Sequence, residues 1–302
     1  MRWQVFWVFF GLVYAVAAPA AAPHARHAPA NLALAVATAR DSGRAADPAQ
    51  LNLKSASVLV LDGEDDRVLY AHNADIVTPI ASITKLMTAI VVLDAKQPLD
   101  EQLSVEQADI DTLKATHSRL RTGTKLTRRE LLKLALMASE NRAAGALGRN
   151  YPGGKTAFVE AMNRKAAALG MTKTHYVDPC GLSEHNVSTA EDLAKIVRAA
   201  SGYEIIREFT TTSKHAVTIR GQRKPTEFRN TNRLIQGPHP EWKVELSKTG
   251  YTAEAGRCLV MKIRVGKQPV IMVFLNAWGK LSPVGDATRV RRWLERHPTE
   301  RG

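Results

Sequence analysis

The stretch from Ile80 to Leu93 most restricts how this chain can fold, because it is apolar on every face of a helix. Its apolar residues are Ile80, Ala81, Ile83, Leu86, Met87, Ala89, Ile90, Val91, Val92 and Leu93. A surface helix keeps one polar face, so a helix of this kind belongs in the core. We expect it to span about 79–95, with Thr78 as its cap and Pro79 at its first position.

Two side chains in this helix are chemically usable, Ser82 and Lys85. Their i,i+3 spacing places them one turn apart on one face. A serine hydroxyl is a poor nucleophile until a base removes its proton. A lysine amine can be that base if burial and a second cation lower its pKa. With 13 serines and 17 lysines in 302 residues, chance alone gives about one such pair, so the pair needs support from elsewhere.

The first residues have the order of a secretory signal. Met1-Arg2 precedes an apolar run from Trp3 to Ala17, which ends in Ala-Val-Ala. The run is short for a membrane span, so we expect a signal peptide at 1–17, export, and no stable membrane anchor after cleavage. Residues 18–50 are rich in Ala, Pro, His and Arg and predict a flexible N-terminal tail.

Charge and cysteine content narrow the range of partners. The formal net charge of +13 favours an anionic partner such as a cell-wall polymer or a membrane surface. Nucleic acid is not expected, because the protein is exported and carries no nucleic-acid-binding motif. No Cys/His cluster has metal-ligand spacing, so we expect no metal and no cofactor. For Cys180 and Cys258 the sequence leaves two alternatives open, a disulfide and two unpaired thiols.

Strand patterns lie at both ends of the remaining chain, with helices between them. Strands are expected at 57–61, 67–71, 242–248, 257–265 and 269–276, a strand pair at 214–220 and 226–234 around Gly221, and helices at 127–138, 155–169, 188–200 and 286–296. Thr127 and Glu130 form a capping box. Residues 98–125 lack periodicity. The order predicts an α/β (α+β) domain at 51–297, in which one antiparallel sheet uses strands from both ends and a helical lobe is inserted at about 98–200.

Two further motifs join Ser82 and Lys85. Ser139-Glu140-Asn141 lies at a predicted helix end, and Lys248-Thr249-Gly250 closes a predicted strand. Acyl transfer needs a nucleophile, a base, a proton for the leaving amine and an oxyanion site. Ser82 would attack and Lys85 would be the base. Ser139 would relay a proton, and Asn141 would bind the substrate amide.

The third motif would hold the substrate. Lys248 would supply positive charge, which keeps Lys85 neutral more of the time and attracts a carboxylate. Thr249 would donate a hydrogen bond to that carboxylate. Gly250 would leave space where the substrate pairs with the strand edge.

The ordered set Ser-x-x-Lys, Ser-x-Asn, Lys-Thr-Gly resembles that of penicillin-binding proteins and class A β-lactamases. The resemblance covers roughly 51–297 and implies a β-lactamase/transpeptidase-like fold, with a five-stranded antiparallel sheet flanked by helices. It also implies an oxyanion hole formed by the backbone N–H groups of Ser82 and Tyr251. β-Lactam antibiotics would then be covalent inhibitors.

Within this group the chain is most similar to the penicillin-binding protein 7/8 type D-alanyl-D-alanine endopeptidases of serine peptidase family S11. The segments 82–89 and 178–183 carry this likeness, although Cys180 stands where many relatives have a small polar residue. The resemblance implies a periplasmic hydrolase that cleaves D-Ala-diaminopimelate cross-links between the stem peptides of peptidoglycan.

Three alternatives remain. A D,D-carboxypeptidase would remove terminal D-Ala, but the familiar membrane-anchored members continue into a further domain, whereas this sequence ends soon after Lys248. A class A-like β-lactamase would need a Glu-x-x-Leu-Asn type segment, which is absent, and Glu140 replaces its usual Asp. A non-catalytic murein-binding protein would not need three intact motifs.

Overall fold

The structure, a computed structural model, describes residues 51–219 and 222–297. The predicted signal peptide at 1–17, the predicted tail at 18–50 and the predicted turn residue Gly221 lie outside these residues. The described residues belong to one compact unit. None of the helices that they form is long and apolar enough to cross a membrane.

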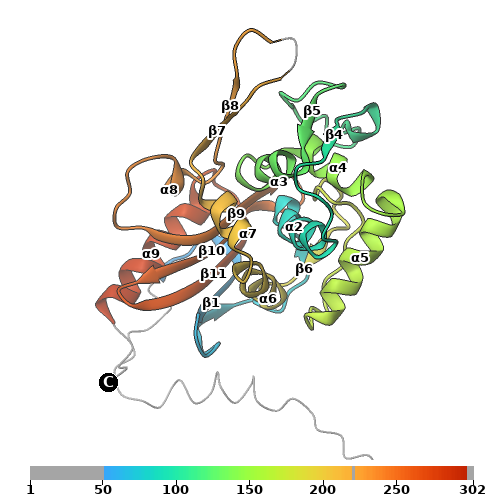
Figure 1. The fold of residues 1–302 in the computed structure, drawn as a ribbon. Coiled ribbons are helices and arrows are strands. Elements are labelled where there is room, and N and C mark those ends of the chain that lie inside the picture. The colour runs from blue at the N-terminus through green and yellow to red at the C-terminus, as the bar shows by residue number, and fades with distance from the viewer. Residues whose placement is uncertain (1–50, 220–221, 298–302) are drawn as a thin grey trace, which may run out of the picture. The chain divides into compact units, whose positions relative to one another are not determined.

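A five-stranded antiparallel sheet forms the centre of this unit, in the strand order β2-β1-β11-β10-β9 (Figure 1). Its strands are β1 (Ser55–Asp62), β2 (Val68–His72), β9 (Lys243–Thr252), β10 (Gly256–Val265) and β11 (Gln268–Ala277). Val60 of β1 pairs with Met272 of β11, so strands from both ends of the domain meet inside the sheet. This confirms the predicted α/β fold. It also leaves β9 as an edge strand, free to pair with a substrate.

Helices cover both faces of the sheet, because side chains along its strands alternate between two apolar clusters. Val60 of β1 packs in the cluster of α9 (Ser282–Arg296). Its neighbour Leu59 packs in the cluster on the other face, with α2 (Lys85–Asp94) and α6 (Ala190–Ser201). The C-terminal helix therefore lies on the opposite face from the helix that carries Lys85.

The buried Asp286 of α9 holds the first strand in place. Its carboxylate accepts hydrogen bonds from the Ser55 N–H at 2.8 Å, the Ser55 Oγ at 2.6 Å and the Lys54 N–H at 3.0 Å. Charge-assisted bonds to a buried carboxylate are stronger than neutral ones. They fix β1 against the last helix.

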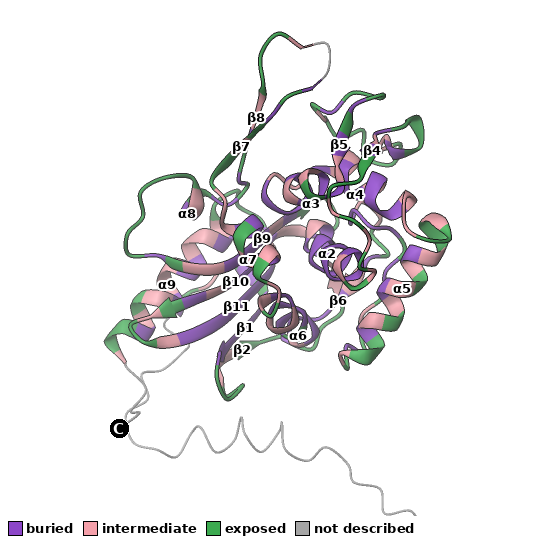
Figure 2. Cartoon of the chain, in the orientation of Figure 1, coloured by how far each residue is buried: buried purple, intermediate pink, exposed green. Residues whose placement is uncertain are grey.

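The inserted lobe surrounds α2, which is buried along most of its length (Figure 2). Its elements are β4 (Gln102–Ser104), η3 (Gln107–Asp109), β5 (Lys125–Thr127), α3 (Arg128–Met137), α4 (Asn141–Arg149) and α5 (Gly154–Ala168). The capping box of α3 forms as predicted, with the Glu130 N–H donating to the Thr127 Oγ1 at 3.1 Å and the Thr127 N–H donating to the Glu130 Oε2 at 2.8 Å.

The beginning of the buried helix differs from the prediction. Thr78 and Pro79 do not cap it but form β3 (Thr78–Pro79), which pairs with β6 (Val187–Ser188). A short 3₁₀ turn, η2 (Ala81–Thr84), then precedes α2. The Ile80 N–H donates to the carbonyl of Asn186 at 3.0 Å, so contact with a distant loop overrides the local helix signal.

Other boundaries were also wrong. The motif Lys248-Thr249-Gly250 lies inside β9 and does not close it. The strand predicted at 226–234 is shorter: β8 (Thr226–Arg229), which pairs with β7 (Lys214–Val217), ends at Arg229. Residues 230–234 are not part of it, because Asn232 caps the short helix α8 (Arg233–Gln236). Three helices were not predicted, α4, α7 (Glu204–Thr211) and α8.

Candidate active site

Ser82 is the one residue between Ile80 and Val92 that is not buried. It lies in η2, and Lys85 begins α2 one turn later. The Lys85 Nζ lies 2.7 Å from the Ser82 Oγ. The pair expected from the i,i+3 spacing is therefore within hydrogen-bond distance, with an accessible hydroxyl and a fully buried amine.

The surroundings of Lys85 suit a neutral amine. Burial lowers the pKa of Lys85, since the ammonium form loses its hydration, although the carboxylates of Asp178 and Glu140 oppose the shift. A neutral amine offers two N–H donors and one lone pair. The Asn141 Oδ1 at 2.7 Å and the Cys180 carbonyl at 2.6 Å can accept the two donors, and the Ser82 hydroxyl can donate to the lone pair.

A second buried lysine faces the other motif. The Lys248 Nζ lies 2.9 Å from the Ser139 Oγ and 2.8 Å from the carbonyl of Thr249. Burial, with the charge of Lys85 as a further cause, holds the pKa of Lys248 well below its usual value. The sequence prediction treated Lys248 as a cation that depresses the pKa of Lys85. In the structure, burial is the largest cause of the lowered pKa of both lysines.

The loop between α3 and α4 positions Ser139 and Asn141. Ser139 has φ +58°, a left-handed conformation that few residues other than glycine adopt. Glu140 caps α4 by accepting from the Arg142 N–H at 3.0 Å, and the Ser118 hydroxyl donates to its other oxygen. Asn141 donates through Nδ2 to the Thr116 Oγ1 at 2.9 Å while its Oδ1 faces Lys85. Both ends of this amide are thus held.

A loop after α5 supports the nucleophile, although the sequence analysis gave its segment 178–183 no role beyond the likeness to the endopeptidases. Asp178 accepts from the N–H groups of Cys180 at 2.6 Å and Gly181 at 2.7 Å, which directs the Cys180 carbonyl at Lys85. Asn186 donates to the Thr84 Oγ1 at 3.1 Å. The sequence contains Asp178, Gly181 and Asn186 close together, which was the signal that could have identified this supporting loop. Only the fold shows that they lie beneath η2.

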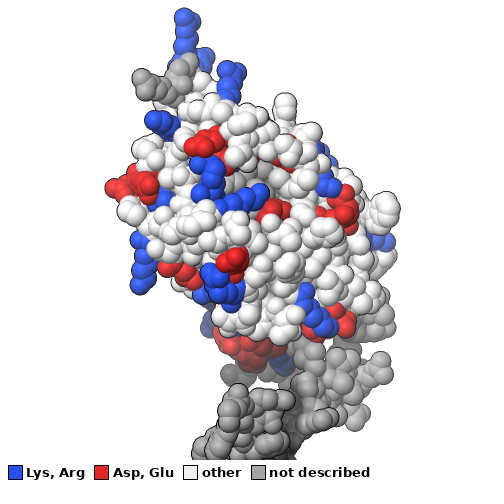
Figure 3. All heavy atoms as spheres, turned by 90° about the vertical axis from the view of Figure 1, so that its right-hand side faces the viewer, with Lys and Arg blue, Asp and Glu red and all other residues white. Residues whose placement is uncertain are grey.

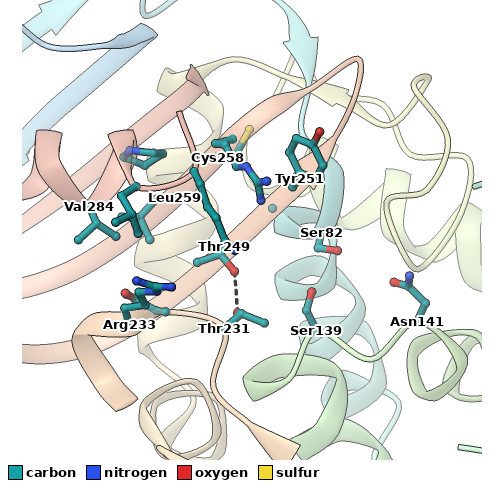
Figure 4. A pocket seen from close by; sticks show the side chains of 16 residues that line it. Ser82, Ser139, Asn141, Thr231, Arg233, Thr249, Tyr251, Cys258, Leu259 and Val284 are labelled. Carbon is teal, nitrogen blue, oxygen red and sulfur yellow. Dashed lines mark hydrogen bonds between the residues drawn. The ribbon is translucent and has the colours of Figure 1, made fainter. Parts of the chain in front are cut away.

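A groove of about 320 Å³ opens on Ser82 and runs along the edge strand β9 (Figure 4). Ser82, Ser139, Asn141, Thr249, Gly250 and Tyr251 line it, and Lys85 and Lys248 are buried beside it. Gly250 has a further role, because a Cβ there would lie 3.0 Å from the Ile80 carbonyl oxygen and 3.2 Å from the Ser82 N. The eight predicted site residues therefore come together, and the glycine lets β9 approach the nucleophile.

The two cysteines are free in the structure, so of the two open alternatives it contains the unpaired thiols. Both are buried, and the Cys180 Sγ lies 3.3 Å from the Asn141 carbonyl oxygen. Burial raises the pKa of Cys180 to about 12, which keeps this thiol protonated near neutral pH. Among the described residues no group of three or more His, Cys, Asp or Glu is placed to hold a metal ion.

Comparisons with known proteins agree with this geometry. A D-alanyl-D-alanine endopeptidase from Pseudomonas aeruginosa is 51% identical over 267 residues, which cover 87% of this chain and 86% of that protein. A D-alanyl-D-alanine endopeptidase from Escherichia coli is 45% identical over 246 residues, which cover 82% of this chain and 79% of that protein.

Solved structures show the same fold. A DD-transpeptidase from Streptomyces matches with a TM-score of 0.73 and 28% identity, covering 80% of this chain and 97% of that chain. A penicillin-binding protein from Listeria monocytogenes in its cefotaxime-bound form matches with a TM-score of 0.69 and 29% identity, with the same coverage. The family profile described as D-alanyl-D-alanine carboxypeptidase, peptidase S11, matches residues 43–279. The chain therefore belongs to the S11 family of serine peptidases.

Proposed function

We propose that this protein is a periplasmic serine D,D-endopeptidase, which hydrolyses D-Ala-diaminopimelate cross-links of peptidoglycan through an acyl-enzyme. The 2.7 Å contact between the Ser82 Oγ and the Lys85 Nζ carries the proposal, because burial prepares that amine to accept a proton. The endopeptidases at 51% and 45% identity support this choice of substrate.

Acylation uses both lysine-serine pairs. The Ser82 Oγ attacks the carbonyl carbon of D-Ala and the Lys85 Nζ takes its proton. The N–H groups of Ser82 and Tyr251 stabilise the oxyanion. When the intermediate collapses, the C–N bond breaks, and the proton that Lys85 took from Ser82 passes through Ser139 to the leaving amine, so Lys85 is neutral again. Lys248 holds Ser139 for this transfer, with its Nζ 2.9 Å from the Ser139 Oγ.

Deacylation reverses the same steps with water. Water attacks the ester carbonyl and gives its proton to Lys85. The Ser82 oxygen then leaves and regains a proton from that amine. The tetrapeptide stem departs with a new carboxylate, and the enzyme returns to its starting state.

The leaving side of the groove can accept either a cross-link or a terminal D-Ala. In a cross-link, the diaminopimelate centre that provides the amide nitrogen also carries a carboxylate. Thr249, whose Oγ1 is 2.6 Å from the Thr231 Oγ1 at the open edge of β9, can hold that carboxylate as readily as the carboxylate of a terminal D-Ala. The two substrates therefore differ in what lies beyond Thr249.

The charge of the chain suits an anionic wall polymer. The formal net charge is +13, and across the face drawn in Figure 3 basic side chains are interspersed with acidic ones. Attraction to the wall would therefore act over the whole molecule rather than through one patch on that face. It would also be weakened by salt.

Muropeptide profiling tests the proposal. Purified enzyme should convert cross-linked dimers to monomers without removing terminal D-Ala from free pentapeptides, and fluorescent penicillin should label it covalently. The Ser82→Ala variant should lose both reactions while it keeps its circular dichroism spectrum. Release of D-Ala from pentapeptides with dimers left intact would identify a carboxypeptidase. An unlabelled, inactive wild-type enzyme would identify a murein-binding protein.

A further inference from the structure

The groove that contains Ser82 continues past Thr249 to a basic end. Its lining includes three basic residues, Arg233 of α8, Arg257 of β10 and Lys280, which lies just before α9. Of its 16 lining residues none is an aspartate or glutamate. In Figure 4 Arg233 and Val284 lie on the other side of Thr249 from Ser82.

None of the three cations has an ion pair or a side-chain hydrogen bond with a described residue. Arg233 and Lys280 are exposed, and neither side chain has an ion pair or a hydrogen bond with a described residue. Arg257 stacks on Tyr251, with its Cζ 3.6 Å from the ring centroid, and its buried Nε has no partner. Elsewhere basic side chains commonly have a carboxylate partner, as Lys262 has Glu245 at 3.3 Å.

The N-terminus of α9 adds to the positive potential at this end. Leu281, Pro283 and Val284 line the groove where this 15-residue helix begins. Its N-cap residue Leu281 provides no side-chain hydrogen bond, and the first turn contains no acidic residue. A helix N-terminus carries a partial positive charge that favours an anion. Unpaired cations, absent carboxylates and the helix terminus therefore point to a negatively charged ligand.

We propose that Arg233, Lys280 and Arg257 form a subsite for a carboxylate of the second stem peptide, the leaving half of a cross-link. The proposal rests on the endopeptidase function above. A terminal D-Ala ends at the carboxylate beside Thr249 and does not reach this subsite. The second stem continues from the same position and brings further carboxylates. The basic end thus discriminates cross-links from free pentapeptides.

The test compares two double variants that each remove two exposed positive charges. Arg233→Gln with Lys280→Gln changes the groove. Lys267→Gln with Arg292→Gln is the matched control, because both residues are exposed, have no ion pair with a described residue and lie outside the groove. Three values are measured: kcat/KM for a cross-linked dimer, kcat/KM for a pentapeptide, and the rate of acylation by penicillin.

The groove variant should lose roughly tenfold in kcat/KM for the dimer, about threefold for each exposed charge, with the other two values unchanged. The control should match the wild type in all three. A dimer whose carboxylates are amidated should be cleaved equally by both variants. Equal losses on dimer and pentapeptide, or no loss on the dimer, would overturn the subsite.

Binding separates this subsite from the reaction itself. In a Ser82→Ala background, which cannot form an acyl-enzyme, the Kd of the dimer should rise roughly tenfold with the groove changes and stay constant with the control changes. A wild-type enzyme that leaves dimers intact would refute the endopeptidase proposal. The binding result would still decide the subsite, which fails if the groove changes leave Kd unaltered.

Discussion

Gly181 supports the nucleophile through its lack of a side chain, which makes Gly181→Ala an informative perturbation. Its φ is +77°, and a Cβ added there would lie 1.9 Å from the carbonyl oxygen of Ala81 and 2.4 Å from the carbonyl carbon. Real Cβ contacts stay above 3.0 Å, so the loop and η2 would have to separate by about 1 Å. The residue is also tethered, because its N–H donates to Asp178 at 2.7 Å.

The magnitude follows from these two strains. A left-handed conformation costs an L-residue roughly 1 kcal/mol, and overpacking adds about 2 kcal/mol, so the free energy of unfolding should fall by about 3 kcal/mol. The shift would move Ser82 and the carbonyl of Cys180, 2.6 Å from the Lys85 Nζ, relative to each other. A misplacement of about 1 Å typically costs on the order of 100-fold in rate. Urea unfolding and the second-order rate of penicillin labelling measure the two effects.

Gly170→Ala is the matched control. Gly170 has φ +69° with no atom within 4 Å of an added Cβ, so only the backbone strain applies. This variant should lose about 1 kcal/mol and be labelled at the wild-type rate. If Gly181→Ala were labelled as fast as Gly170→Ala and unfolded at the same urea concentration, the support ascribed to this loop would be refuted.

Two further predictions concern the buried lysines. Because the pKa of Lys85 is lowered, penicillin labelling should increase as pH rises through that depressed value and then level off. The Lys85→Arg variant should not be labelled, since a guanidinium stays protonated. Labelling of that variant would refute the role of Lys85 as the base. The pKa of Lys248 is lowered in the folded state, so between this pKa and about 10.4 the unfolded chain binds more protons and stability rises with pH. Urea unfolding should therefore show Lys248→Met stabilised relative to wild type, most at low pH and progressively less toward pH 10, whereas an advantage that grows with pH would contradict this account.

The parts of the structure predicted correctly from sequence are those with strong local signals. The apolar strands, the Thr127 capping box and the three motifs all depend on residues close together in sequence. The order of the elements then predicted a sheet shared by both ends of the domain. The pair Ser82–Lys85 could be proposed before any distance was known, because both residues lie in one motif. The contact between Ser139 and Lys248 was not predicted, since it joins two motifs that only the fold brings together.

The errors arise where distant contacts decide local structure. Pro79 is a favourable first residue of a helix, yet it pairs with Val187 instead. Gly145 and Gly148 weaken the helix signal of α4, which therefore was not predicted. Gly250 suggested the end of a strand, but it lies mid-strand because β9 must pass close to Ser82. The basic end of the groove could not be predicted, since Arg233, Arg257 and Lys280 share no spacing.

The pairing of β1 with β11 also sets the time at which the enzyme becomes active. Val60 and Met272 pair across more than two hundred residues, and Lys248 lies in β9, whose one partner strand among the described residues is β10. A chain still emerging from the ribosome contains Ser82 and Lys85 but neither the strand that holds the second lysine nor the centre of the sheet. Contacts this far apart in sequence form late and slowly. Hydrolytic activity must therefore await the last part of the chain, and an incomplete product carries no assembled active site.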